Sequence, residues 1–270
     1  MGRQENVEIF DDTMAYCSSD EDLKANISKS TLGQLLILEN DIIPHFKAQY
    51  KENADVIVSD KRTFQAAESY AYAGKKVCVL NFASATNPGG GVLNGAGAQE
   101  ECLCRCSTLY FNLTKRILYT DFYIPHRNLQ NPLHNNDIIY SPAVTVFKSD
   151  TESPALLDKK DWFSVNVISC AAPNLRFMPQ GTISNEEIYT IQLERFSRIL
   201  SVAAAQKNEV VILGAFGCGA FKNDASVVAE AAKNSVREFL KYFETIEFAI
   251  YCKETDKTNF TVFRDALKDL

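Results

Sequence analysis

The chain has 270 residues, of which 46% are hydrophobic and 23% are charged, and its formal net charge is −6. This length and apolar content suit one large α/β domain, alone or with a helical extension. The acidic balance argues against direct nucleic-acid binding, because such binding depends on lysine and arginine side chains that neutralise phosphates.

Residues 1–30 are polar and acidic, which predicts either a weakly ordered arm or a docked extension. An apolar stripe over Leu35–Phe46 favours a helix from Thr31 towards Lys51, with Pro44 as a point where it kinks or stops. We accordingly divide the chain into an N-terminal helical extension, residues 1–50, and one compact domain, residues 51–270.

Strands and helices then alternate. Asp55–Ser59 and Lys76–Ala83 are short apolar runs that predict buried strands, and Thr63–Tyr72 predicts a helix between them. A glycine-rich loop, Ser84–Ala98, follows the second strand. Gln99–Leu118 has apolar residues at helical spacing, which predicts one long helix.

The second half continues the alternation after residues 119–136, whose prolines and asparagines are typical of a loop. Beyond that loop we predict, in chain order, strand Asp137–Lys148 broken at Pro142, strand Phe163–Ala171, helix Asn185–Gln206, strand Glu209–Ala215, helix Asn223–Tyr242, strand Ile246–Tyr251 and helix Asn259–Lys268. This order favours an α/β fold, a sheet with helices on both faces.

Eight cysteines are scattered without the spacing of a disulfide framework. The first ten residues are polar, so no signal peptide is visible, and no run approaches the ~18 apolar residues of a membrane span. We therefore expect a cytoplasmic protein with free thiols and no membrane contact.

The first chemical motif is Asn87-Pro88-Gly89-Gly90-Gly91, followed after seven residues by Gln99-Glu100-Glu101. Three glycines after a buried strand let a ligand approach the backbone closely and allow positive φ angles. Two glutamates at the start of the next helix lie at the carboxyl end of a strand, where open α/β sheets bind ligands. Each half alone is also compatible with a plain surface loop or an acidic helix start, and it is their conjunction that indicates a site.

A second loop, Gly214 to Asp224 (GAFGCGAFKND), also follows a buried strand and precedes a helix. Successive backbone N–H groups in such a turn can hold a diphosphate, and the helix dipole favours an anion there. The pattern is neither a Walker loop nor a dinucleotide-binding fingerprint. Taken alone, this loop is equally compatible with a structural turn, but two glycine-rich loops after two strands favour a shared cleft.

Together these motifs resemble the microbial-type branch of the poly(ADP-ribose) glycohydrolases. The resemblance covers residues 55–250 and rests on the run Leu80–Tyr110, with its Gly-Gly-Gly and Gln-Glu-Glu, and on the late glycine loop. It implies a macrodomain-like fold, a mixed sheet flanked by helices, that binds ADP-ribose in a cleft. The first 50 residues match only loosely.

The resemblance also implies roles for the motif residues. Glu101 would be the catalytic acid, Glu100 would hold ribose hydroxyls beside the scissile bond, and Gln99 would place this glutamate pair. The ligand-binding residues would be Asn87 and Phe221 at the terminal ribose, Gly89, Gly90 and Gly91 along the ribose and diphosphate, and Gly217, Cys218, Gly219 and Ala220 at the diphosphate.

These residue types suit the cleavage of a ribose–ribose bond. One carboxylic acid can protonate the leaving oxygen and, as a carboxylate, activate water afterwards. Separate carboxylates share these tasks in many glycosidases, but adjacent glutamates point in different directions, so we expect one acid/base and one positioning group. This scheme needs no metal and no cofactor.

Two other arrangements are less favoured. Cys102, Cys104 and Cys106 lack the partner ligands of a zinc site, and buried free thiols explain them more simply. A cysteine hydrolase would need a histidine nearby, and His45, His126 and His134 stand in no recognisable context.

The leading hypothesis is a monomeric poly(ADP-ribose) glycohydrolase that releases ADP-ribose from the polymer or from ADP-ribosylated protein. An eraser of single ADP-ribose groups would need nearly the same pocket. A non-catalytic ADP-ribose-binding module is a further alternative, although pure binding has little use for the acid pair Glu100-Glu101. A phosphatase or a dehydrogenase is disfavoured by the motifs. Whether chain ends or internal bonds are cut stays open.

Overall fold

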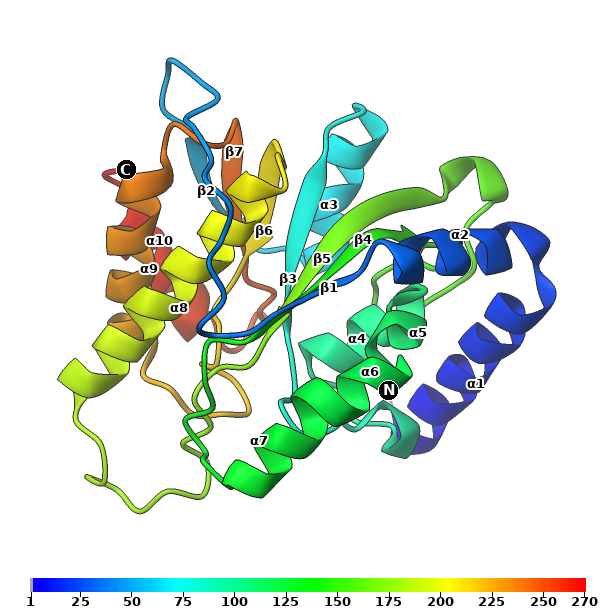
Figure 1. Cartoon of the computed structure of the whole chain (residues 1–270), viewed down its shortest axis with the longest axis horizontal. Helices are drawn as coiled ribbons and strands as arrows, with labels where there is room; N and C mark the ends of the chain where they lie inside the picture. Colours follow the sequence, from blue (N-terminus) through cyan, green and yellow to red (C-terminus); the bar gives the residue numbers. More distant parts are fainter. Residues whose placement is uncertain (1) are drawn as a thin grey trace.

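The computed structural model describes residues 2–270 (Figure 1). Its strands are β1 (Leu35–Ile37), β2 (Asp55–Ser59), β3 (Val77–Phe82), β4 (Ile138–Val146), β5 (Phe163–Cys170), β6 (Val210–Leu213) and β7 (Thr245–Ala249). Its α-helices are α1 (Arg3–Ser19), α2 (Glu21–Leu32), α3 (Thr63–Tyr72), α4 (Gln99–Cys106), α5 (Leu109–Leu113), α6 (Arg116–Leu118), α7 (Ile124–Leu129), α8 (Asn185–Ala205), α9 (Ala225–Phe239) and α10 (Thr258–Leu267). Short 3-10 turns cover Val92–Asn94 (η1) and Lys159–Asp161 (η3), and a π-helical turn covers Tyr119–Tyr123 (η2).

All seven strands form one sheet in the order β1-β4-β5-β3-β6-β7-β2. The neighbours from β5 to β2 are parallel, whereas β4 pairs antiparallel with both β5 and β1. The prediction of an α/β fold with a mixed sheet is therefore confirmed.

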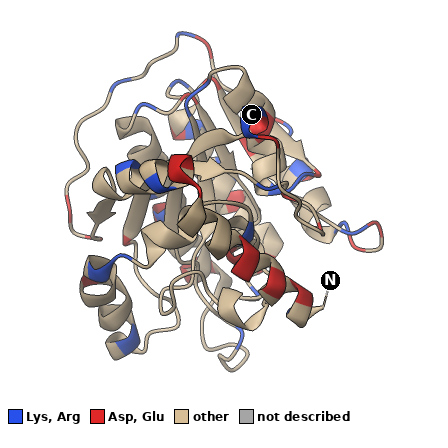
Figure 2. Ribbon diagram, turned by 90° about the vertical axis from the view of Figure 1, so that its right-hand side faces the viewer, with Lys and Arg blue, Asp and Glu red and all other residues tan. Residues whose placement is uncertain are grey.

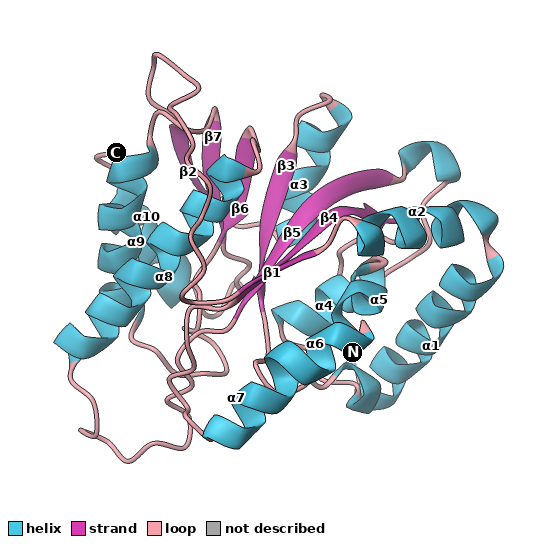
Figure 3. Ribbon diagram, viewed as in Figure 1, coloured by secondary structure: helices cyan, strands magenta, loops and turns pink. Residues whose placement is uncertain are grey.

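Helices cover both faces of this sheet (Figure 3). Side chains of β3 alternate between the faces: Cys78 and Leu80 belong to the core that α8, α9 and α10 cover, and Val77 and Val79 belong to the core beneath α3, α4 and α5. This alternation follows from the two-residue period of a strand. The strand β3 is buried between the two helical layers, and its carboxyl end opens into the site described below.

The N-terminal prediction was partly wrong. Residues 3–32 form two docked helices, which confirms the docked extension and not the weakly ordered arm, while Met1 lies outside the described residues. The predicted helix Thr31–Lys51 does not exist, because Leu35–Ile37 pairs with Tyr140–Ile138 as an edge strand and an irregular segment follows. Pairing with a distant strand outweighed the helical spacing of the apolar residues. The division of the chain at residue 50 stays a prediction.

Residues 99–136 also differ from the prediction. The expected helix Gln99–Leu118 is broken into α4, α5 and α6, because Ser107 and Thr108 leave the helix to bond with β4. The N–H of Thr108 donates to Thr145 O at 3.0 Å, and the N–H of Thr145 donates to Thr108 Oγ1 at 3.1 Å. The predicted loop 119–136 contains η2 and α7, whose Pro125 sits in the first helical turn, where proline is tolerated.

The remaining predicted elements are present, with shifts of at most three residues at their ends. The expectation of a buried strand at Asp55–Ser59 was wrong, because β2 lies at the edge of the sheet and has no buried residue. At Pro142 the register of β4 against β5 shifts, so proline occupies a bulge where no ladder hydrogen bond is lost. Across residues 2–270, no helix combines the length and the apolar character needed to cross a membrane.

Candidate active site

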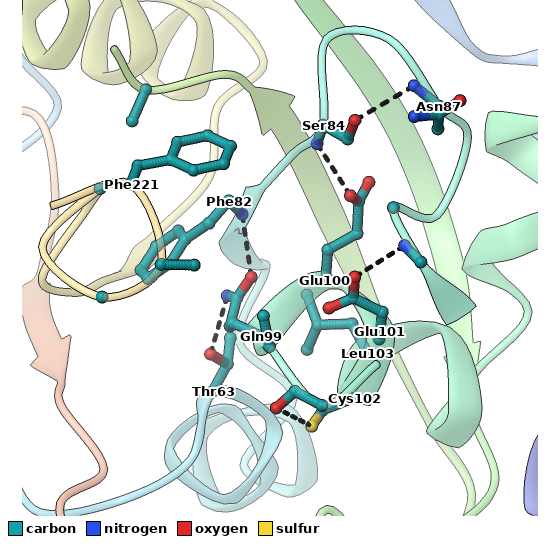
Figure 4. A pocket seen from close by; sticks show the side chains of 18 of the residues that line it. Thr63, Phe82, Ser84, Asn87, Gln99, Glu100, Glu101, Cys102, Leu103 and Phe221 are labelled. Carbon is teal, nitrogen blue, oxygen red and sulfur yellow. Dashed lines mark hydrogen bonds between the residues drawn. The ribbon is translucent and has the colours of Figure 1, made fainter. Parts of the chain in front are cut away.

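The two glycine-rich loops lie side by side. One follows β3 and the other follows β6, and these strands are parallel neighbours, so both loops leave the same edge of the sheet. They line one cavity of about 970 Å³ (Figure 4). A cavity of this size can hold a dinucleotide-sized ligand.

The structure brings most of the predicted site residues to this cavity. Gln99, Glu100 and Glu101 line it, together with Asn87, Gly90, Gly91, Gly217, Gly219, Ala220 and Phe221. Two predicted residues do not line it. Gly89 is buried beneath the ring of Tyr110, and the half-buried Cys218 packs against the core below α8 and α9.

Glycine is required where the first loop turns over the glutamates. Gly89 and Gly90 have φ angles of 67° and 61°, in the left-handed region that side chains rarely adopt. A Cβ atom on Gly90 would overlap Oε1 of Glu101 and would lie 3.0 Å from Oε2 of Glu100. The loop can therefore cover the glutamate pair only while this position carries no side chain.

Glu101 is held by one oxygen and leaves the other without a partner. The backbone N–H of Gly91 donates to its Oε1 at 2.8 Å. Its Oε2 is buried and has no hydrogen-bond partner among the described residues. The side chain is only 6% exposed, although it lines the cavity. One carboxyl oxygen is thus held by the loop, and the other has no hydrogen-bond partner among the described residues.

Glu100 is anchored to the sheet. Its Oε1 accepts from Asn81 Nδ2 at 3.2 Å, and its Oε2 accepts from the backbone N–H of Ser84 at 2.8 Å. Burial raises the pKa of Glu100 to about 8, although the hydrogen bonds from Ser84 and Asn81 act in the opposite direction. This carboxyl is therefore largely protonated at neutral pH, and a protonated carboxyl can also donate a hydrogen bond.

Gln99 fastens the start of α4 to β3. Its Oε1 accepts from the N–H of Phe82 at 2.9 Å, and its Nε2 donates to Leu80 O at 2.7 Å and to Thr63 Oγ1 at 3.0 Å. These three bonds engage both the oxygen and the nitrogen of the side-chain amide. Gln99 therefore fixes the helix that carries Glu100 and Glu101.

The second loop presents unpaired backbone donors. Within residues 2–270, the N–H groups of Gly219, Ala220 and Phe221 donate to no protein acceptor. Gly217, with a φ angle of 81°, turns the chain below them, and its carbonyl accepts from Asn223 Nδ2 at 3.1 Å. Adjacent free N–H groups of this kind bind anionic oxygens. The start of α9 is already capped by the carboxylate of Asp224, which leaves the loop amides as the unpaired backbone donors of this wall.

The comparison with known families decides the assignment. The family model described as "Microbial-type PARG, catalytic domain" matches residues 4–149, which is more than half of the chain. The chain belongs to this family of poly(ADP-ribose) glycohydrolases.

Solved structures of glycohydrolases match over nearly the whole chain. The poly(ADP-ribose) glycohydrolase of Thermomonospora curvata has a TM-score of 0.87 and 28% identity, covering 97% of this chain and 99% of its own. Its complex with the inhibitor ADP-HPD gives a TM-score of 0.84 at 29% identity, with the same coverage. The Deinococcus radiodurans enzyme in complex with ADP-ribose gives 0.79 at 30% identity, covering 90% of this chain and 97% of its own. No curated protein matches.

These similarities confirm the macrodomain-like fold and the membership that the motifs indicated. Phe221 lies across the cavity from the glutamates: Figure 4 shows its ring directed towards the side that carries Glu100 and Glu101, whereas the ring of Phe82 points away from them. Phe82 in turn packs against Phe216, with ring centroids 5.5 Å apart.

Several residues that line the glycohydrolase cavity were missed by sequence reasoning. Arg127 on α7 donates from Nε to Thr86 O at 2.7 Å and from Nη2 to Asn87 Oδ1 at 3.5 Å, so it ties α7 to the first glycine loop. His134, whose pKa burial lowers to about 4, also lines the cavity. Further lining residues that carried no motif signal include Arg62, Tyr119, Asp150 and Tyr251.

The cysteines of α4 behave as packing residues, except for the first. Cys104 and Cys106 are fully buried, whereas Cys102 lines the cavity and lies 3.2 Å from Nη2 of Arg105. Within the part of the chain that the structure describes, no three His, Cys, Asp or Glu side chains gather as metal ligands. His126 is buried and bonds to Phe122 O and Asn135 Oδ1, which is a structural role.

Proposed function

We propose that this glycohydrolase cleaves the ribose–ribose O-glycosidic bonds of poly(ADP-ribose) and releases ADP-ribose, with Glu101 as general acid and then general base. The observation that carries the proposal is the asymmetric carboxyl of Glu101. One oxygen accepts from the N–H of Gly91, and the other is buried and unpartnered, in a residue that lines the cavity. An acid/base group needs one free oxygen that exchanges a proton in a defined place.

The reaction then runs in two proton transfers. Glu101 donates its proton to the bridging oxygen, the bond from this oxygen to the ribose C1 atom breaks, and the departing ribose leaves with a hydroxyl group. The remaining ribose carries oxocarbenium character. The Glu101 carboxylate then takes a proton from a water molecule as the water oxygen bonds to C1, which returns the acid.

Glu100 has a different task in this proposal. Its oxygens are tied to Asn81 and Ser84, so it cannot swing to exchange protons with water. As a buried carboxyl that is largely protonated, it can donate to a ribose hydroxyl next to the bond. Asn87, whose side chain Arg127 holds at the cavity rim, would contact the same ribose.

The diphosphate of the substrate would lie on the second loop. The free N–H groups of Gly219, Ala220 and Phe221 supply the donors, and Phe221 packs against the terminal ribose. The solved relatives support ADP-ribose as the ligand, because the Deinococcus enzyme was crystallised with ADP-ribose and the Thermomonospora enzyme with ADP-HPD. Backbone donors explain how a chain of net charge −6 binds a polyanion.

We also propose that the enzyme works without a metal, as a monomer in the cytoplasm, and without direct contact with nucleic acid or membrane. Carboxyl and amide groups supply each step described above, so no Lewis acid is needed. All eight cysteines are free thiols, and such proteins suit a reducing compartment. Light scattering of the purified protein tests the monomer, and activity in the presence of EDTA tests the metal.

One digest tests the activity and the acid together. Wild type and Glu101→Gln are incubated with poly(ADP-ribose), with and without EDTA, and released ADP-ribose is quantified. We expect release by the wild type alone, unaffected by EDTA, while Glu101→Gln keeps its affinity for ADP-ribose within about tenfold, since the amide preserves shape but has no proton to give.

The other possible outcomes of this digest would each change the proposed function or the proposed acid. Turnover by Glu101→Gln at the wild-type rate would remove Glu101 from catalysis. Tight ADP-ribose binding by a wild type that releases nothing from the polymer would favour an eraser of single ADP-ribose groups or a binding module. A protein carrying a single ADP-ribose group is the substrate that separates these two alternatives.

A further inference from the structure

Helix α1 lies against the outside of the loop that holds Glu101. The main chain at Gly95, with a φ angle of 68°, touches the main chain of Arg3 so closely that a Cβ atom on Gly95 would overlap the Arg3 carbonyl. The buried Asn6 donates from Nδ2 to Gly95 O at 2.9 Å. Two segments almost ninety residues apart are therefore in direct contact at this point.

The contact point is coupled to Glu101 by a tight turn. The N–H of Gly95 donates to Val92 O and the N–H of Ala96 donates to Gly91 O, both at 3.1 Å. Gly91 is the residue whose N–H holds Oε1 of Glu101. A Cβ atom on Gly91 would lie 2.9 Å from Cβ of Ala96, so the two ends of the turn are packed closely against each other. A shift at Gly95 would therefore move the donor of Glu101.

Two further contacts link α1 to the same loop and to α4. Phe10 packs edge-on against Tyr110, with ring centroids 4.9 Å apart, and Tyr110 is the ring that covers Gly89. Thr13 Oγ1 donates to Arg105 O at 2.6 Å, and Arg105 Nη1 donates to Ala96 O at 2.7 Å. The helix thus supports the glycine loop near both of its ends.

The helix itself is fixed to the body of the domain. Lys148, only 2% exposed, donates from Nζ to Asp12 Oδ2 at 2.6 Å and to Ile9 O at 3.1 Å. Phe10 and Cys17 are buried. The exposed face of α1 carries Glu5, Glu8 and Asp11 (Figure 2). Such a face repels a polyanionic substrate, so a contribution of α1 to the reaction would not come from holding the polymer.

We propose that α1 belongs to the catalytic apparatus as a support, and that Asn6 is a positioning residue that keeps the Gly91 N–H on Glu101 through the turn 91–96. This inference rests on the proposed function for its kinetic consequence, but not for its structural one. It assigns the N-terminal segment a role in the reaction.

The test compares Asn6→Ala with Gln4→Ala, a matched change at an exposed position of the same helix. Steady-state kinetics on poly(ADP-ribose) are combined with amide hydrogen exchange. We expect Asn6→Ala to lower kcat by about tenfold or more, since small misplacements of a catalytic group have effects of this size. KM and ADP-ribose affinity should stay within about threefold, and Gln4→Ala should resemble the wild type.

Hydrogen exchange separates positioning from a general loss of stability. In Asn6→Ala, amides of residues 89–97 should exchange faster while those of β3 keep their protection. Faster exchange across the whole domain, or an unchanged kcat despite local loosening, would overturn the proposal. Phe10→Leu, which keeps an apolar side chain but removes the ring contact with Tyr110, provides a second variant and should show the same local pattern.

The same experiment distinguishes this proposal from the assigned activity. A wild type without glycohydrolase activity would contradict the proposed function. The hydrogen-exchange comparison would still test the contact between α1 and the loop. In that case, unchanged amide exchange of residues 89–97 in both variants would overturn the proposal that α1 supports the loop. Faster exchange of these residues would sustain that structural part of the proposal.

Discussion

Asn81 reaches Glu100 from within the sheet: its Nδ2 lies 3.2 Å from Oε1 of Glu100 and 2.9 Å from Oγ of Ser169. Asn81 belongs to β3 and Ser169 to the neighbouring strand β5. The first glutamate of the pair is therefore tied to the centre of the sheet, while the second is tied to a loop. This difference in support matches the two roles proposed for them.

The buried carboxyl of Glu100 should make stability depend on pH. An unfolded glutamate titrates near 4.5, whereas burial raises the pKa of Glu100 to about 8 in the folded protein. The folded state therefore binds more protons across this window, and the wild type loses stability as pH rises from about 4.5 to 8. Glu100→Gln removes this loss. The difference in the free energy of unfolding between Glu100→Gln and wild type should therefore grow in favour of the variant as pH rises, by a few kcal/mol at most.

Urea denaturation at several pH values between 5 and 8 measures this difference. The exposed Glu254 offers a control, because Glu254→Gln changes the same group at the surface. A difference between Glu100→Gln and wild type that does not change with pH would contradict the buried, protonated state of Glu100.

A side chain at Gly90 should abolish activity. In Gly90→Val the new Cβ would overlap Oε1 of Glu101, and the φ angle of 61° is strained for any branched residue. We expect turnover to fall by about a hundredfold or more, because Glu101 is displaced, and ADP-ribose binding to be blocked because the loop is pushed into the cavity. Digestion of poly(ADP-ribose) and calorimetry with ADP-ribose measure the two losses.

Gly219 provides a contrasting case on the facing loop. A Cβ atom there meets no protein atom within 4 Å, and the residue is exposed at the cavity. Gly219→Val should therefore keep the wild-type melting temperature but block the approach of a diphosphate, with a loss of ADP-ribose affinity of about tenfold or more. Wild-type affinity in this folded variant would remove the second loop from the binding site.

Gln99→Ala should destabilise the fold and displace both glutamates. The change removes three hydrogen bonds and leaves the N–H of Phe82 and the carbonyl of Leu80 without these partners. We expect a loss of about 2–4 kcal/mol in the free energy of unfolding, since unpaired buried polar groups are costly. Chemical denaturation measures this loss, and Gln180→Ala at an exposed position is the control. A loss below about 0.5 kcal/mol would show that Gln99 does not fasten α4.

The elements that the sequence predicted well depend on local signals. Asp55–Ser59 and Thr63–Tyr72 were predicted with their observed bounds, because an apolar run and a helical stripe are readable without knowledge of the partner. The two glycine loops were predicted for the same reason, since closely spaced glycines after a strand indicate a backbone that turns tightly or lies close to a ligand.

The parts that were missed depend on distant contacts. The short strand β1 exists only through its pairing with β4, and the break after Cys106 exists only because Thr108 bonds to Thr145. Arg127 enters the site from a segment that had no helix signal of its own. The motif indicated both glutamates, but it contained no information about which carboxyl oxygen would be left free.

The contacts of α1 and β1 also set an order for the chain as it is made. Asn6 bonds to Gly95, 89 residues later, and Ile9 accepts from Lys148, 139 residues later. Strand β1 can pair only after β4 has been made, and β2 can pair only after β7 has been made. The segment that carries α1 and β1 therefore leaves the ribosome before the segments that secure it. Before these contacts form, the segment is exposed to chaperones and proteases. The helix that supports the loop in the finished enzyme is therefore unprotected while the rest of the chain is being made.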